Sequence, residues 1–381
     1  YWCTDCETAL AEAEIEYKDV DSETVYVKFP VIEGNGLFDE RDTYFVIWTT
    51  TPWTLPGNTG ITVNPDFKYS LIDVNGEKLV IATERIEPVL KDAGVEEYTV
   101  IKEFEGKEFD GVKCKHPFLN RESKVVMGSP DTVDVDLEAG TGEVHTAPGY
   151  GKEDYLCGLK NGLEMIVCVD DKGHQTKEAG PFAGMFYAKS NKEIVKWLDE
   201  NDLLFAKKKI NHSYPHCWRC KKPIIFRATK QWFASIDKFR ADSLKAIKNV
   251  KWVPAWGEDR ISKMIEERND WCISRQRTWG VPLPIFYCKN CEKEYVTDSS
   301  MEKVINLVKK HGTNCWFDME AKDLLPADAK CPECGCKELE VGIESGNNEM
   351  RNKIHKIGNA SEVFETISKI MKAGINVKGY F

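Results

Sequence analysis

Four Cys-x-x-Cys turns constrain the fold of this 381-residue chain more than any other feature of its sequence. They are Cys3/Cys6, Cys217/Cys220, Cys288/Cys291 and Cys331/Cys334. The chain is too long for a small disulfide-held scaffold. Two such turns aim four thiolates at one tetrahedral ion, and zinc takes that set of ligands. The four turns therefore predict two zinc ions in a reducing compartment. Redox-active or inert buried cysteines are the alternative.

The partner of each turn follows from the sequence between them. A short stretch separates Cys291 from Cys331, and a helix is predicted over 299–311, so Cys288, Cys291, Cys331 and Cys334 make a local zinc ribbon. Cys336 is an alternative ligand in place of Cys331 or Cys334. The turns at Cys3 and Cys217 would then share the second ion. Their ion would close a loop of more than two hundred residues, and such an insertion can fold as its own domain.

The composition limits the classes of partner. Lys and Arg number 52 against 62 Asp and Glu, a net charge of −10, which argues against a uniformly basic nucleic-acid-binding surface. Local basic patches at 207–209 and 219–222 are candidates for phosphate contact, or simply a solubilising surface. No apolar run approaches the roughly 18 residues of a membrane helix. The first residues lack an initiator Met and signal-peptide features, so we expect the inside of a longer polypeptide.

The stretch between the first two cysteine turns is typical of a β-rich domain. β-branched and aromatic residues concentrate in four predicted strands, at 25–29, 43–48, 70–74 and 78–82. Helices are predicted at 83–93 and 191–201. After about residue 208 longer helices and a Trp-rich stretch begin, and we expect a boundary there.

Two segments of this region carry more polar groups than a fold requires. Thr49–Asn58 combines four threonines and an asparagine with two prolines that stiffen the loop. Gly140–Tyr155 combines His145 and Asp154 with glycines that allow backbone to approach a ligand. A proline-stiffened turn and a structural histidine are the plainer alternatives. The residues alone predict a polar ligand pocket and no more.

Five segments, in this order, resemble isoleucyl-tRNA synthetases of class I. They are WCTDCETALAEAEIEY from Trp2, TTTPWTLPGN from Thr49, GTGEVHTAPGYGKEDY from Gly140, HSYPHCWRCKKPIIFRATKQWF from His212 and WCISRQRTWGVPLPIFYC from Trp271. The second and third are similar to the two editing peptides of the family. Valyl and leucyl relatives carry an Arg and an acidic residue where this chain has Thr51 and Trp53.

The resemblance implies a mixed α/β and β fold, with a β-barrel-like editing domain of the Val/Ile/Leu-tRNA synthetase type inserted in a partial Rossmann-type core. The implied domains are zinc-bearing connective strands at 1–29, the editing domain at 30–206, partial catalytic core at 207–287 and a second zinc module at 288–340. The ATP-site signatures HIGH and KMSKS are absent from the sequence. We therefore expect ATP and magnesium to act only in the full-length ligase, and no aminoacylation by this chain alone.

The resemblance also implies a reaction. One methylene in a binding pocket discriminates substrates only about 10–200-fold, a limit for which isoleucyl-tRNA synthetases are the standard example. A second site therefore hydrolyses valine from mischarged tRNA(Ile). Carried over to this chain, the catalytic residues are Thr50, Thr51, Thr54 and Asp154, with Asp154 binding the α-ammonium. His145 lines the side-chain pocket, and Trp53 and Asn58 shape it. No general base is evident. A non-catalytic tRNA- and zinc-binding fragment is the alternative.

The remaining expectations concern partners and the end of the chain. The family implies a cytoplasmic monomer, active in protein biosynthesis, that binds the valine-bearing 3′ end of tRNA(Ile) and no membrane. Residues 341–381 resemble instead one piece of a radical S-adenosylmethionine barrel, although its cluster motif C-x-x-x-C-x-x-C is missing. A fused or misassembled tail is the favoured interpretation, and a divergence within the family is the alternative.

Overall fold

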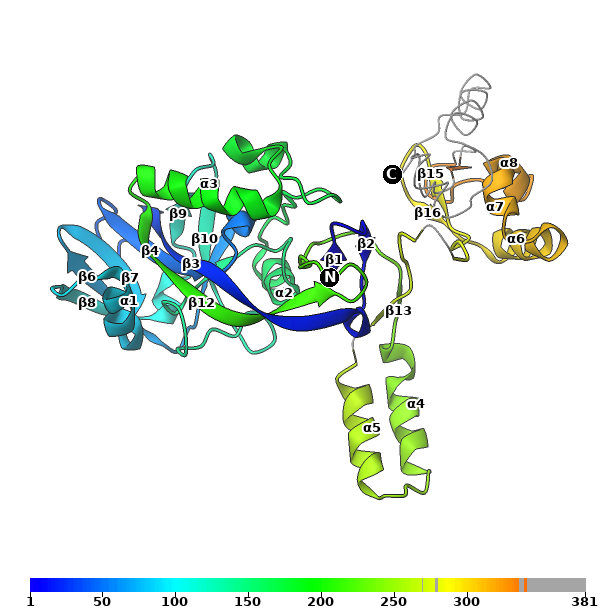
Figure 1. The fold of residues 1–381 in the computed structure, drawn as a ribbon, viewed down its shortest axis with the longest axis horizontal. Coiled ribbons are helices and arrows are strands. Elements are labelled where there is room, and N and C mark those ends of the chain that lie inside the picture. The colour runs from blue at the N-terminus through cyan, green and yellow to red at the C-terminus, as the bar shows by residue number, and fades with distance from the viewer. Residues whose placement is uncertain (269, 278–279, 336–338, 341–381) are drawn as a thin grey trace. The chain divides into compact units, whose positions relative to one another are not determined.

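The computed structural model describes residues 1–268, 270–277, 280–335 and 339–340. The chain divides into two compact units, one covering Tyr1–Cys272 and one beginning at Ile273 (Figure 1). No helix within the described ranges is long and apolar enough to cross a membrane.

The strands of the first unit are β1 (Trp2–Cys3), β2 (Thr8–Ala9), β3 (Ile15–Glu33), β4 (Thr43–Thr49), β5 (Gly60–Val63), β6 (Lys68–Val74), β7 (Glu77–Ala82), β8 (Thr99–Glu105), β9 (Lys113–Lys115), β10 (Glu122–Met127), β11 (Glu143–Thr146), β12 (Leu204–Cys217), β13 (Phe233–Ala234) and β14 (Trp271–Cys272). Its α-helices are α1 (Ile86–Ala93), α2 (Lys152–Asn161), α3 (Tyr187–Glu200), α4 (Asp237–Lys248) and α5 (Trp256–Glu266). Short 3-10 helices cover Glu12–Glu14, Pro52–Gly57 (η2), Thr83–Arg85, Gly106–Phe109 and Lys177–Phe182.

One large sheet organises the first unit. Its strand order is β12-β3-β9-β10-β5-β11-β4-β7-β6-β8. β3 also pairs with β4, so the strands β3, β9, β10, β5, β11 and β4 form a closed ring of pairings. β11 lies between β5, which it meets antiparallel, and β4, which it meets parallel. The end of β4 and the whole of β11 therefore lie side by side, which brings the two predicted polar segments together.

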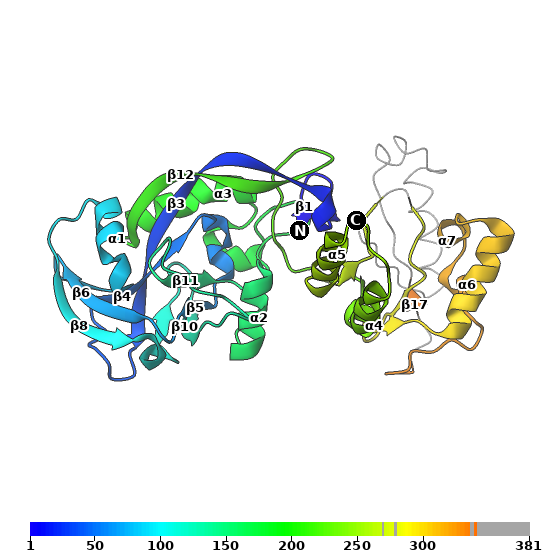
Figure 2. The ribbon, with the colours of Figure 1, turned by 90° about the horizontal axis from the view of Figure 1, so that it is seen from below.

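β3 and β12 form a long two-stranded ribbon that leaves this ring (Figures 1 and 2). Their pairing runs from Val27 opposite Leu204 to Ile15 opposite Cys217. The half of β3 before Thr24 is mostly exposed on both faces, whereas the half from Thr24 to Val31 is buried. The predicted strand at 25–29 is thus the buried half of a 19-residue strand.

Two apolar cores hold this sheet. Inside the ring, Phe109 makes edge or tilted contacts with Phe45, Tyr69 and Phe104 at centroid separations of 5.2–5.6 Å. On the opposite face, α1 buries Ile86, Val89 and Leu90 against strand residues such as Val46 and Ile81. α3 closes the first core with Ile194, Val195 and Leu198. The helix has its apolar side chains at a spacing of three to four residues, as an amphipathic helix requires.

The second unit is built around a small three-stranded sheet. Its elements are β15 (Phe286–Cys288), β16 (Glu294–Tyr295), α6 (Asp298–His311), α7 (Cys315–Asp318), α8 (Ala321–Leu324) and β17 (Leu339–Glu340). β15 is the central strand. Phe286, Tyr295, Trp316 and Leu324 form its buried core. The Thr297 hydroxyl caps α6 by accepting from the Ser300 amide at 3.1 Å, so this helix begins one residue before the predicted start.

The expected mixed fold with a β-rich domain is confirmed. The predicted helices at 83–93 and 191–201 correspond to a 3-10 turn followed by α1, and to most of α3. The proposed limits at 29/30 and 206/207 stay predictions, and β3 and β12 continue through them. The tail at 341–381 lies outside the described residues.

Candidate active site and cysteine clusters

A pocket of about 290 Å³ lies where β4 ends and β11 begins. Both predicted polar segments line it. Its lining residues are Trp48, Thr49, Thr50, Thr51, Thr54, Asp134, Asp136, Ala139, Gly140, Thr141, Gly142, Glu143, Val144, His145, Ala147, Tyr150 and Asp154. Five of the seven predicted site residues therefore share one cavity.

The threonine-rich loop is held by hydrogen bonds within itself. After β4 the chain turns into η2, and the Thr54 amide donates to the Thr51 carbonyl at 2.9 Å. The Thr54 hydroxyl donates to the same carbonyl at 2.8 Å. The Thr51 amide donates to Thr49 Oγ1 at 3.1 Å. These bonds present the hydroxyls of Thr51 and Thr54 on the pocket side of the loop.

His145 joins the two segments. Its Nε2 lies 2.9 Å from Thr54 Oγ1, and its Nδ1 lies 2.8 Å from Asn58 Nδ2. Burial lowers the pKa of His145 to about 4, so the imidazole is neutral near pH 7. With both ring nitrogens engaged, this histidine is poorly suited to take a proton from water.

Asp154 stands on the first turn of α2, across the pocket from this network. One carboxyl oxygen accepts from the Ala147 amide at 3.2 Å. Burial raises the pKa of Asp154 to about 6, and the Ala147 amide opposes that rise. A bound ammonium would supply the charge that favours the ionised carboxylate. The exposed Asp134 and Asp136 add negative charge at the rim.

Trp53 and Asn58 lie behind the pocket and do not line it. Trp53 is buried between Tyr150 and Tyr187, with ring centroids 5.2 Å from each. Its amide donates to Asn191 on α3, and Gln175 donates to its carbonyl. The 3-10 turn points Thr54 to the pocket and the neighbouring Trp53 to the core. Trp53 therefore anchors the loop to α3.

The sequence analysis missed several residues of the site. Trp48 and Thr49 precede the threonine motif on β4, and the acidic rim lies in a loop with no motif of its own. Glu143 is 2% exposed, and neither carboxyl oxygen makes a hydrogen bond among the described residues. Burial raises the pKa of Glu143 well above its ordinary value, against the opposing effect of the Val46 amide. The available signal was the position of Glu143 within the second polar segment.

Glycines allow the close packing of the two segments. A Cβ on Gly57 would lie 2.4 Å from the Tyr150 ring, which is in the second segment. Gly142 has a φ of +80°, and a Cβ there would lie 2.4 Å from that of Ala82. A side chain at either position would push the β11 segment away from its neighbours.

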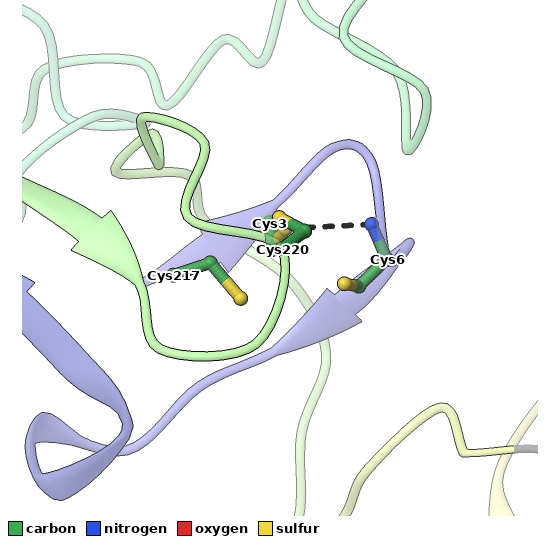
Figure 3. A group of neighbouring side chains, drawn as sticks. All are labelled: Cys3, Cys6, Cys217 and Cys220. Atoms are coloured by element: carbon green, nitrogen blue, oxygen red, sulfur yellow. Dashed lines mark hydrogen bonds between the residues drawn. The ribbon is translucent and has the colours of Figure 1, made fainter.

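The first cysteine cluster gathers Cys3, Cys6, Cys217 and Cys220 at the end of the ribbon where Ile15 pairs with Cys217 (Figure 3). All four sulfurs lie within 4.8 Å of one another, and Cys3 Sγ is 3.4 Å from Cys220 Sγ. The Cys6 amide donates to Cys3 Sγ at 3.3 Å. Figure 3 shows the four side chains converging from two separate turns. The two turns in this cluster are the ones expected to share an ion once the other two turns are assigned to the local zinc ribbon.

Trp2 and the segment after Cys220 tie this cluster to the sheet body. Trp2 and Ile225 exchange backbone hydrogen bonds of 2.8 and 2.9 Å. Trp2 is 3% exposed and belongs to the larger apolar cluster of the first unit. The Arg227 guanidinium stacks over its ring at 5.3 Å and pairs with Asp171.

The second cluster, Cys288, Cys291, Cys331 and Cys334, lies wholly in the second unit. Cys288 Sγ lies 3.4 Å from Cys334 Sγ, and Cys291 Sγ lies 3.5 Å from Cys331 Sγ. Cys288 and Cys331 also pack in the small apolar core. The alternative ligand Cys336 lies outside the described residues.

Both donor sets fit a tetrahedral metal ion. None of the described cysteines is in a disulfide, and four thiolates about 2.3 Å from zinc stand about 3.8 Å apart. Burial raises the pKa of the Cys3 thiol, and raises that of Cys6 to about 11. A bound dication reverses this effect because it binds the thiolate directly. Each cluster can therefore hold one metal ion.

Residues 1–360 match the family described as tRNA synthetases class I (I, L, M and V), and the chain belongs to that family.

Its similar relatives are isoleucine–tRNA ligases. The chain is 56% identical over 345 residues to the isoleucine–tRNA ligase of Caldicellulosiruptor bescii, covering 89% of this chain and 37% of that protein. It is 53% identical over 355 residues to that of Moorella thermoacetica, covering 91% of this chain and 38% of that protein. The chain thus spans well under half the length of these relatives.

Solved structures give weaker likenesses. The editing domain of P. knowlesi cytosolic leucyl-tRNA synthetase is 13% identical, with a TM-score of 0.38, covering 49% of this chain and 96% of that chain. The corresponding P. falciparum domain is 13% identical, with a TM-score of 0.37, covering 49% and 99%.

The family match reaches residue 360, well past the expected boundary at 340. No comparison supports the resemblance of the tail to a radical S-adenosylmethionine barrel.

Proposed function

We propose that this chain carries the editing site of an isoleucine–tRNA ligase and hydrolyses valine from mischarged tRNA(Ile). The observation that carries the proposal is the shared cavity, which is lined by threonine hydroxyls, a neutral histidine bonded to one of them and a half-buried aspartate. ATP and magnesium would serve aminoacylation only in the longer ligase. The editing domain would cover about 30–206, with zinc-bearing strands at 1–29, partial core at 207–287 and a second zinc module at 288–340.

The proposed reaction assigns each group a role. Asp154 binds the α-ammonium of the aminoacyl ester, and the hydroxyls of Thr50, Thr51 and Thr54 hold the carbonyl and the attacking water. Water oxygen bonds to the ester carbon, and the bond from that carbon to the ribose oxygen breaks. The proton of the water passes to the ribose oxygen, which gives free valine and uncharged tRNA. His145 limits the side-chain space and so disfavours isoleucine. A hydroxyl of the substrate's ribose is the proposed assistant, because no side chain is placed as a base.

Zinc is proposed as structural at both clusters. Cys3, Cys6, Cys217 and Cys220 would hold one ion, and Cys288, Cys291, Cys331 and Cys334 the other. Such closed four-thiolate sites stabilise folds and offer no open position for a substrate. We further propose a cytoplasmic monomer as the working form.

The test is deacylation of valine- and isoleucine-charged tRNA(Ile) by the chain. We expect release of valine, sparing of isoleucine and no isoleucine-dependent pyrophosphate exchange. Equal hydrolysis of both esters, or any such exchange, contradicts the proposal. No hydrolysis of either ester, with tRNA binding retained, would favour the alternative of a non-catalytic tRNA- and zinc-binding fragment.

Asp154→Ala sharpens the test. An ammonium held by a carboxylate is worth about 1.5–3 kcal/mol, so the variant should deacylate about 10- to 150-fold more slowly. Glu153→Ala is the matched control, because Glu153 is exposed on the same helix turn and does not line the pocket. A folded Asp154→Ala variant with the unmodified rate would show that the assignment is wrong.

A further inference from the structure

A chain of buried polar groups runs from the interior of the strand ring to the pocket. It begins at Ser123 on β10, which is fully buried, and its hydroxyl donates to Asn58 Oδ1. Asn58, also fully buried, contacts His145, and His145 contacts Thr54. Ser123 does not line the pocket. It lies 65 residues from Asn58 in sequence.

The orientation of the Asn58 amide follows from its neighbours. Asn58 Nδ2 lies 2.8 Å from the Gly60 carbonyl oxygen. A carbonyl oxygen can only accept, so the amide atom facing it must be the NH₂ group. The Ser123 hydroxyl on the other side donates to the amide oxygen, which agrees with that orientation. Two independent partners therefore set the amide.

The Asn58 amide in turn sets the protonation of His145. Its NH₂ group has two hydrogens; one goes to Gly60, and the other points at His145 Nδ1 at 2.8 Å. Nδ1 must therefore accept, and the ring proton of the neutral imidazole must lie on Nε2. Nε2–H then donates to Thr54 Oγ1 at 2.9 Å.

The hydrogen-bond network ends at Thr54 and Thr51, which line the pocket. Because Thr54 Oγ1 accepts from His145, its own proton goes to the Thr51 carbonyl at 2.8 Å. Within the described part of the chain, the hydrogen-bond contacts of Thr51 Oγ1 are long, 3.3 Å to Thr54 Oγ1 and 3.4 Å to Thr49 Oγ1. Hydroxyl hydrogen bonds are normally about 2.7–2.8 Å. The Thr51 hydroxyl is thus the member of the network that a ligand can recruit at little cost.

We propose that Ser123 and Asn58 are positioning residues that hold His145 in its neutral Nε2–H form. Each group of the hydrogen-bond network then donates to the next group on the side of the pocket, and the Thr51 hydroxyl remains available to donate to a ligand. A donor placed there would stabilise negative charge on the ester carbonyl during water attack. The kinetic part of this inference rests on the proposed editing function. The tautomer rests on the hydrogen-bond geometry alone.

The titratable groups near His145 are consistent with a neutral ring. His116, which holds the η2 loop by donating to the Leu55 carbonyl at 2.9 Å, has its pKa lowered to about 3 by burial and is uncharged. Burial raises the pKa of Glu143, on the same strand, and so favours its neutral form. The other ionisable groups that share the pocket with His145 among the described residues are Asp154, Tyr150 and the two rim carboxylates, Asp134 and Asp136.

Nitrogen NMR of the chain labelled with ¹⁵N-histidine tests the tautomer directly. His145→Gln identifies the signal among the seven histidines. We expect a neutral ring with the proton on Nε2 from pH 6 to 8. A proton on Nδ1, or a charged ring in this range, would overturn the proposal.

Asn58→Asp should reverse the direction of hydrogen-bond donation between residue 58 and His145. A carboxylate beside Nδ1 can only accept, so the ring proton should move to Nδ1 and the pKa of His145 should rise. Because a misplaced tautomer alone can cost several orders of magnitude in rate, we expect deacylation to slow by about a hundredfold or more. The remaining activity should depend on pH near neutrality. Retention of Nε2–H with full activity would overturn the proposal.

Ser123→Ala is the milder variant and does not place a charge in the core. We expect kcat for deacylation to fall about three- to tenfold with KM unchanged, the factor that one net hydrogen bond is worth. Ser70→Ala is the matched control, since Ser70 is fully buried on β6 and its hydroxyl bonds the Thr83 hydroxyl at 2.9 Å, away from the His145 network. Equal losses in the two variants would mean a merely structural role for Ser123. An Nε2–H tautomer in a chain that hydrolyses neither ester would overturn the proposed function and still support the tautomer.

Discussion

The two cysteine clusters offer the same ligands and hold very different lengths of chain. Cys3 and Cys220 are 217 residues apart, whereas Cys288 and Cys334 are 46 apart. On loop length alone, closing the longer loop removes about 1.4 kcal/mol more entropy from the unfolded chain. The first cluster also shares Trp2 with the sheet core, whereas the second packs only on its own small core. The same set of four cysteines therefore joins the two ends of a large inserted segment in the first cluster and closes a short zinc ribbon in the second.

Loss of the first cluster should have the largest effect. Cys217→Ser removes a buried ligand at the end of β12. We expect bound zinc to fall from two ions to one per chain, and the unfolding free energy of the first unit to fall on the order of 5 kcal/mol. This is less than the about 10–16 kcal/mol of isolated zinc-finger peptides, because the sheet core would remain. Metal analysis and urea unfolding measure both quantities.

The matched control is Cys288→Ser, which removes the corresponding buried ligand of the second cluster. It should also cost one zinc ion, but the unfolding of the first unit should not change. If the two variants destabilise the first unit equally, the contrast between the clusters is wrong. Two ions retained by Cys217→Ser would show that the pairing of turns is wrong.

Trp2→Ala should have a smaller effect and separates the metal from its attachment. Trp2 donates its indole N–H to the Asp171 carbonyl at 2.8 Å and is buried in the larger apolar cluster of the first unit. Truncation should lower the unfolding free energy of the first unit by about 3 kcal/mol and leave two zinc ions bound. Trp316→Ala makes a similar cavity in the second unit and should leave the first unaffected. Zinc loss in Trp2→Ala would mean that cluster and core cannot be separated.

The pairing of the cysteine turns was predictable because one pair was local and left the other pair no choice. The meeting of the threonine loop with His145 and Asp154 was predictable only through the family resemblance, since the contacts cross about 90 residues. Trp53 was assigned to the pocket because it sits within the motif, but the 3-10 turn points it into the core. The exposed half of β3 was missed because both its faces lie in solvent and carry no apolar alternation. Ser123 carried no signal, as its partner is set by the parallel pairing of β10 with β5.

Glu143 couples the stability of the first unit to acidity. An unfolded glutamate releases its proton near pH 4.3, whereas the buried side chain keeps it to much higher pH. Folding therefore takes up a proton between those limits, and its contribution is complete below about pH 4.3 and lost as the pH rises. Wherever the pH lies between the two pKa values of Glu143, we expect the unfolding free energy to fall by up to about 1.4 kcal/mol per pH unit. Above pH 7 the contributions of Asp154, His116 and His145 no longer change with pH. Urea unfolding at pH 7 and 8 should show this slope in the native chain and its loss in Glu143→Gln. The same slope in both proteins would mean that another group takes up the proton.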